Sequence, residues 1–249
     1  LRGKPQIPIV AGLIGITALS WWYMFYLAAD MESSMQMMAG AMGAMEMSWT
    51  VADFTANLLM WAVMMVAMMV PSASPTIMLY ARLQQDKQGN TRFKPILLFL
   101  GGYLCAWTLF SLGASLTQWG LHEGALLSGA MAIDHQWLAA GVLAITGFYQ
   151  WTPLKQACLK HCQSPLGFLL GFWRDDAAGI LRMGWRHGLF CVGCCWLLMA
   201  ILFTVGVMNL LWVALIAIYV LLEKIIPNGQ QFSRVSGLLL CGAAVMVAL

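Results

Sequence analysis

The chain has 249 residues, of which 61% are hydrophobic and only 9% are charged. This composition cannot cover the surface of a water-soluble protein, so it predicts an all-α integral membrane protein. The net charge of +3 is small, and it gives no reason to expect nucleic-acid binding. Because the sequence begins at Leu1 rather than at a methionine, no cleavable signal peptide is assigned.

Seven apolar segments are long enough, or nearly so, to cross a bilayer as helices. Between the fifth and sixth segments, Gly206 and Asn209 are typical of a tight turn. The expected spans are residues 8–28, 53–80, 96–119, 136–152, 188–207, 210–226 and 232–249.

The basic residues indicate the orientation of these spans. With seven spans, all thirteen Lys and Arg residues fall on one side of the membrane. Cytoplasmic loops hold the excess of positive charge, so the N-terminus is expected inside and the C-terminus outside. The outer side carries carboxylates and would attract cations. We therefore expect a multi-pass protein of the bacterial inner membrane.

A single polytopic domain over residues 1–249 is expected, with two long loops. The first is a Met-rich extracytoplasmic loop, residues 30–50. The second is a cytoplasmic loop flanked by cysteines, residues 153–187. In this second loop, apolar residues alternate with arginines, a pattern typical of a helix that lies in the membrane interface.

Five of the seven cysteines flank the inner loop. In "ACLKHCQSP" two cysteines share a helical face, and in "RHGLFCVGCCW" three more do so. Thiolates on two converging elements suit Cu(I) or zinc, and in a reducing compartment they form metal sites more often than disulfides. Simple packing and a redox-active thiol pair are the alternatives. The candidate inner ligands are Cys158, His161, Cys162, His187, Cys191, Cys194 and Cys195.

The outer loop contains seven methionines among small and acidic residues. An exposed loop gains no core packing from methionine, whereas thioethers select Cu(I) and persist in an oxidising compartment. The rival interpretation is a Met-rich docking surface for a partner protein. The candidate outer ligands are Met31, Met35, Met37, Met38, Met42, Met45 and Met47.

The second span continues the methionine pattern. Met60, Met64 and Met68 form a stripe along one helical face, which is either a path for a soft cation or a packing face. Pro71 and Pro75 then predict a kinked helix, whose freed carbonyls must face protein or a polar cavity.

A second extracytoplasmic group of ligand types lies on the hairpin between the third and fourth spans. It combines two imidazoles with two carboxylates, which suits Zn(II) or Cu(II). Helix capping and interfacial roles explain the same residues separately. The group consists of His122, Glu123, Asp134 and His135.

Four stretches resemble a bacterial domain-of-unknown-function family described as predicted metal-binding integral membrane proteins. They are "WAVMMVAMMVPSASP", "YQWTPLKQACLKHCQSPLGF", "RMGWRHGLFCVGCCWLLM" and "GVMNLLWVALIAIYVLLEKIIPNG", and they span about residues 53–231. The resemblance implies metal binding near Cys158, Cys162, Cys191, Cys194 and Cys195.

The leading functional hypothesis is a membrane protein that binds and handles copper or another soft metal, for which a non-enzymatic role is favoured over an enzymatic one. It would capture Cu(I) outside with methionines and hold it at, or relay it to, the inner cysteines, either to move copper inward or to load a neighbouring membrane metalloenzyme. Copper is the expected metal, with zinc as the alternative. The other hypotheses are a non-catalytic accessory subunit of a membrane protein complex, and a membrane thiol oxidoreductase that uses Cys191 and Cys194.

Overall fold

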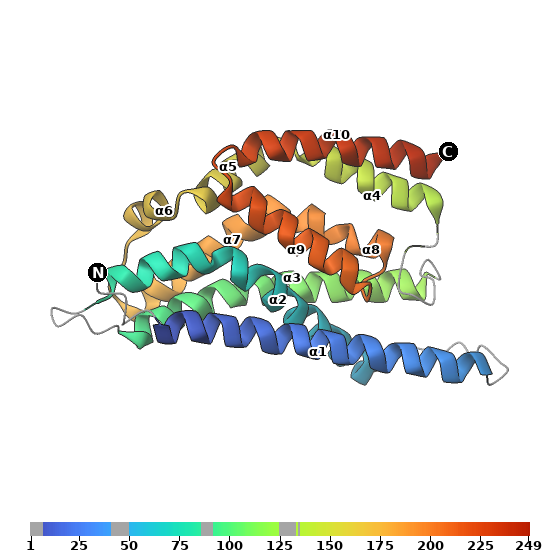
Figure 1. Ribbon diagram of the computed structural model, residues 1–249, viewed down its shortest axis with the longest axis horizontal. Helices are drawn as coiled ribbons and strands as arrows, with labels where there is room; N and C mark the ends of the chain where they lie inside the picture. The colour runs from blue at the N-terminus through green and yellow to red at the C-terminus, as the bar shows by residue number, and fades with distance from the viewer. Residues whose placement is uncertain (1–6, 41–49, 86–91, 125–132, 134) are drawn as a thin grey trace.

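A computed structural model describes residues 7–40, 50–85, 92–124, 133 and 135–249, with only the backbone for residues 31–40. These residues form ten α-helices, most of which run along the long axis of the molecule (Figure 1). The helices are α1 (Ile7–Gly40), α2 (Val51–Leu83), α3 (Phe93–Glu123), α4 (Gln136–Tyr149), α5 (Pro153–Gln163), α6 (Pro165–Phe172), α7 (Ala177–Ala200), α8 (Leu202–Val205), α9 (Leu210–Ile225) and α10 (Gly229–Ala248).

Each of the seven expected segments overlaps a helix of the bundle, and the fifth, 188–207, contains the end of α7 and all of α8. Five helices of the described chain are long and apolar enough to cross a membrane: the first part of α1, α2, α3, α7 together with α8, and α10. The other two expected spans, α4 and α9, have 14 and 16 residues. These two are shorter than the roughly 20 residues that a straight crossing needs.

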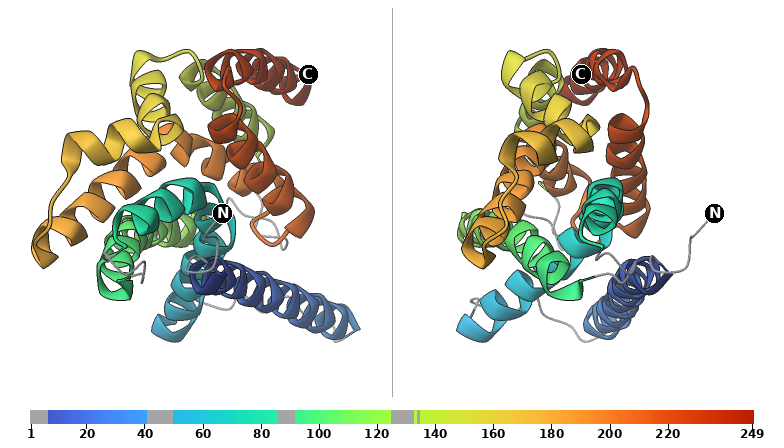
Figure 2. Two further views of the ribbon diagram at one scale, coloured as in Figure 1. Left: turned by 60° about the vertical axis from the view of Figure 1, so that its left-hand side comes forward. Right: turned by 90° about the vertical axis from the view of Figure 1, so that its left-hand side faces the viewer.

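The first helix extends further than expected. α1 continues to Gly40, so the first four methionines of the expected outer loop, Met31 to Met38, lie on helical backbone. Met42, Met45 and Met47 lie outside the described residues. α1 lies at the edge of the bundle, where it packs mainly on α2 (Figure 2).

Residues 153–187 contain two short helices and the first turns of α7. α5 begins at Pro153, and the hydroxyl of Thr152 accepts a hydrogen bond from the backbone N–H of Lys155. α7 begins at Ala177, where the Asp176 carboxylate caps the Gly179 N–H. The expected interfacial segment is therefore divided between α6 and α7.

At the predicted kink in α2, a nearby side chain hydrogen-bonds to a backbone carbonyl that the proline leaves without a donor. Pro75 has no N–H to offer the carbonyl of Pro71, which therefore loses its usual helical donor. The Ser74 hydroxyl donates to that carbonyl at 2.7 Å. This contact agrees with the expectation that freed carbonyls face protein.

The turn between the fifth and sixth expected spans lies where the sequence predicts it. Gly206 has a φ of 93°, in the left-handed region that favours glycine, and ends the short helix α8. Asn209 is the N-cap residue of α9.

The closest helix pair in the bundle is α3 with α7. A Cβ atom added to Gly184 would lie 2.0 Å from the carbonyl oxygen of Phe99, and one added to Gly102 would lie 2.1 Å from that of Leu181. The two helices thus touch backbone to backbone, as small residues allow in membranes. This contact sets the distance between Tyr103 on α3 and Cys191 on α7.

Replacing Gly102 by Ala should separate α3 from α7, because backbone atoms occupy the space that the methyl group needs. We expect a loss of stability of about 1–3 kcal/mol, as for overpacked cores. Thermal unfolding in detergent measures it. The adjacent Gly101→Ala is a matched control, since its nearest neighbour would be at 3.9 Å. Equal unfolding temperatures for the two variants would contradict the predicted clash.

Candidate metal centre

The centre is built on one face of α7. Cys191, Cys194 and Cys195 follow at helical spacing, and all three are buried. The thiols of Cys194 and Cys195 lie 3.1 and 2.9 Å from the Cys191 carbonyl oxygen and donate to it. Their sulfur atoms are thereby held on the same side of the helix.

Helix α5 brings the second pair of cysteines to this face. Cys162 is buried, and its thiol lies within interaction range of the Cys191 and Cys194 side chains. Cys158 is partly buried, and its sulfur lies against Gly193, where a Cβ atom would be only 2.8 Å away. The structure thus brings together the two cysteine motifs that the sequence separates by almost thirty residues.

Helix α2 contributes a thioether. The Met69 sulfur lies 4.0 Å from the Cys195 sulfur. The stripe that the sequence analysis singles out consists of Met60, Met64 and Met68 and does not include Met69. Those three are buried in the hydrophobic core.

A buried lysine completes the contacts of Cys191. Lys224, near the end of α9, donates from Nζ to the Cys191 sulfur and to the Ser72 hydroxyl, at 2.9 Å in both cases. An ammonium group beside a sulfur favours the thiolate, which is the form that binds metals. Sequence reasoning had counted Lys224 only as a marker of topology, because its burial cannot be read from the charge pattern.

A ring of polar contacts ties α2, α3, α7 and α9 together. The Tyr103 hydroxyl donates to the Met69 carbonyl at 2.9 Å and lies 3.1 Å from the Cys191 sulfur. The Ser72 hydroxyl also points to the Met69 carbonyl, at 3.0 Å. Together with the two hydrogen bonds of Lys224, these contacts connect Cys191 to the kinked part of α2.

The centre lies deep along the long helices. Met69 is near the middle of α2, and Cys191 is at the midpoint of the continuous segment Ala177–Val205. The expected position was the cytoplasmic end of the fifth span. The difference arises because α7 begins eleven residues before the expected start of that span.

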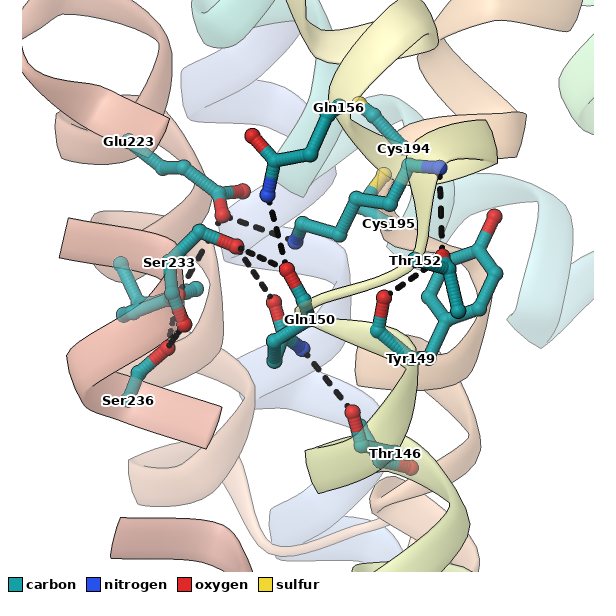
Figure 3. A network of polar contacts seen from close by, with 12 residues as sticks. Thr146, Tyr149, Gln150, Thr152, Gln156, Cys194, Cys195, Glu223, Ser233 and Ser236 are labelled. Atoms are coloured by element: carbon teal, nitrogen blue, oxygen red, sulfur yellow. Dashed lines mark hydrogen bonds and ion pairs between the residues drawn. The ribbon is translucent and has the colours of Figure 1, made fainter. Parts of the chain in front are cut away.

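A buried ion pair lies near the centre, between α5 and α9. Lys155 Nζ lies 2.7 Å from Glu223 Oε1, and both side chains are completely buried. Gln150, at the end of α4, and Ser233, on α10, lie close to Glu223 (Figure 3). The Ser233 hydroxyl donates to Gln150 Oε1 at 2.9 Å.

The two inner histidines have different surroundings. His161 stacks on Phe190, with ring centroids 4.2 Å apart. His187 is buried among Phe99, Tyr103 and Phe168, and its Nδ1 has no hydrogen-bond partner within the described residues. His187 is therefore the better placed of the two, one helical turn before Cys191.

Three members of the expected extracytoplasmic group, His122, Glu123 and His135, lie on described residues at the end of α3 and the start of α4. Glu123 accepts a hydrogen bond from the Trp119 indole at 3.2 Å, and His135 is the N-cap residue of α4. His122, on the last turn of α3, is partly buried. Asp134 lies outside the described residues. For this group, metal binding stays a prediction.

The donor atoms of the inner centre are thiols and one thioether. Among the described residues, no group of three or more His, Cys, Asp or Glu side chains is arranged to hold a metal ion. A closed four-ligand zinc site is thus not preformed in that part of the chain. Clustered thiols with one thioether are instead the soft donors that select Cu(I), which also accepts fewer ligands.

The fold and this centre define the class of protein: a helical protein with helices long and apolar enough to span a membrane and a buried set of sulfur-containing side chains. Residues 58–247 match the family model PpoB2, described as "Copper chaperone". The match covers more than half of the chain, so the chain belongs to this copper chaperone family. Neither the curated proteins nor the solved structures contain a match to the chain.

Replacing Glu223 by Gln should leave the ammonium of Lys155 buried without a counter-charge. We expect a loss of about 3–5 kcal/mol in stability, as for other broken buried ion pairs. Thermal unfolding in detergent checks this. The double variant Lys155→Met/Glu223→Met removes both charges and should recover most of the loss. If the double variant were no more stable than Glu223→Gln, the unpaired charge of Lys155 would not be the cause of the lost stability.

Proposed function

We propose that this protein is a membrane copper chaperone that holds Cu(I) on two thiolates, Cys191 of α7 and one of its two neighbours, Cys162 of α5 or Cys194 of α7. The observation that carries the proposal is the convergence of these three sulfurs in the bundle interior, with the Met69 thioether nearby. Soft, buried sulfur donors favour Cu(I) over hard cations. Burial also keeps the bound ion from water and from oxidants.

Cu(I) would reach this centre from the outer methionines. The Met-rich segment 31–47 begins on α1 and precedes α2, whose interior face carries Met60, Met64 and Met68 before Met69. These α2 methionines are buried and lie in one continuous core with Cys191. The proposed route is a stepwise exchange of Cu(I) between thioethers that ends at the thiolates.

The proposed recipient of the metal is a neighbouring membrane metalloenzyme. The sequence contains no nucleotide-binding motif, so exchange between ligands of increasing affinity would drive the transfer. Thiolates bind Cu(I) more strongly than thioethers, which gives this exchange an inward direction. An accessory subunit without bound copper is the competing proposal, and metal analysis separates the two.

The purified chain should bind one Cu(I) with sulfur ligation, measured by metal analysis and X-ray absorption. Replacing Cys162, Cys191 and Cys194 together by Ser should abolish this binding, because hydroxyl oxygen is a poor ligand for Cu(I). The matched control is Cys105→Ser/Cys241→Ser, whose sulfurs lie away from the centre. Unchanged copper content in the triple variant would overturn the proposal.

Replacing the seven methionines of segment 31–47 by Leu should slow copper loading while leaving the inner site intact. We expect reduced copper content in cells at limiting copper, and normal Cu(I) binding by the purified protein. Leucine keeps the apolar volume but removes the thioether. Equal loading of both proteins at limiting copper would contradict a capture role and favour a docking surface.

A further inference from the structure

Lys224 is an unusual residue to find beside a metal-binding cysteine. Its side chain is only 7% exposed, and its ammonium group donates to one sulfur and one hydroxyl. A buried ammonium group normally requires a carboxylate partner. The identity of the group that balances this charge is therefore a question about function.

The neighbouring carboxylate, Glu223, forms an ion pair with another lysine and does not balance the charge of Lys224. Glu223 pairs with Lys155 at 2.7 Å, and this is the ion pair found in the described part of the chain. Lys155 and Glu223 cancel each other, so Lys224 leaves one excess positive charge in the bundle interior. The polar partners of Lys224, Cys191 and Ser72, include one group that ionises to an anion, the Cys191 thiol.

We infer that Lys224 is a specificity-determining residue whose charge matches a Cu(I) dithiolate and disfavours Zn(II) at the same two sulfurs. This inference rests on the proposed function, because it assumes that the cysteines bind metal. Lys224 acts through Cys191 and does not touch the metal itself. It is a positioning residue rather than a ligand.

The charges can be counted directly. Cu(I) with two thiolates carries one negative charge, which the ammonium of Lys224 cancels. Zn(II) with the same two thiolates is neutral, so the ammonium would remain unbalanced in a medium of low dielectric constant. Uncompensated charge is costly there. The lysine thus stabilises the monovalent complex and penalises the divalent one.

The position of the ammonium does not depend on the metal. Ser72 holds Nζ on the side of α2, and the Ser72 hydroxyl also lies 3.0 Å from the Met69 carbonyl in the kinked segment. Tyr103 contacts the same carbonyl and the same Cys191 sulfur. The positive charge is therefore preorganised at one side of Cys191 before an ion arrives.

The test compares affinities of the purified full chain for Cu(I) and Zn(II), each set by a competing chelator. Lys224→Met should weaken Cu(I) binding and strengthen Zn(II) binding, so that the ratio of the two affinities falls by about tenfold or more. Lys224→Gln should do the same while keeping a donor for Ser72. Lys224→Arg keeps the charge and should retain the ratio.

The matched control is Lys155→Met/Glu223→Met, which removes a buried lysine nearby without changing the net charge of the interior. It should leave the ratio unchanged. Failure of the wild-type chain to bind Cu(I) would overturn the proposed function. If the wild type binds Cu(I) but both neutral variants keep its ratio, the inference about Lys224 is overturned alone. A parallel loss of both metals would also overturn it, because it indicates a three-thiolate site.

Discussion

A positive charge enclosed by helices is the constraint around which this centre is arranged. No water is available inside a membrane bundle to satisfy polar groups, so each must find a partner in the chain. Lys224 finds a sulfur and a hydroxyl, whereas Lys155 finds a carboxylate. The kinked part of α2 supplies the hydroxyl, and α7 supplies the sulfur. Cys191 is the point at which the charge, the kink and the thiol cluster meet.

The close packing of α3 on α7 brings the Tyr103 hydroxyl within hydrogen-bond distance of the Cys191 sulfur. Gly184 and Gly188 allow the α7 backbone to contact the backbone of Phe99 and Tyr103. Tyr103 then reaches both the Cys191 sulfur and the Met69 carbonyl. A larger residue at either glycine would move the tyrosine away from the sulfur. Helix packing and the chemistry of the centre are therefore coupled through one side chain.

Much of the fold is predictable from the sequence, because apolar length and turn residues act locally. Each of the seven expected segments overlaps a helix, and the turn at Gly206 is correct. The meeting of the two cysteine motifs was also expected. The position of the cysteines near the middle of α7 was not expected, because the arginines between residues 174 and 186 suggested that the helix begins after them. Lys224 was not predicted to be part of the centre for a similar reason. A lysine near the end of a membrane helix usually marks the cytoplasmic side, and only the fold shows that this one is buried. Met69 requires the tertiary arrangement, because several methionines of α2 share its local sequence environment.

The unequal exposure of the sulfurs has a kinetic consequence. Cys191, Cys194 and Cys195 are at most 1% exposed, and Cys162 is nearly as well buried, whereas Cys158 is only partly covered. A small chelator in solution cannot surround an ion at the inner sulfurs. Exchange of such an ion would require α5 to shift against Gly193, or an incoming ligand that first meets Cys158. Retention time, and not affinity alone, would then decide which acceptors receive the metal.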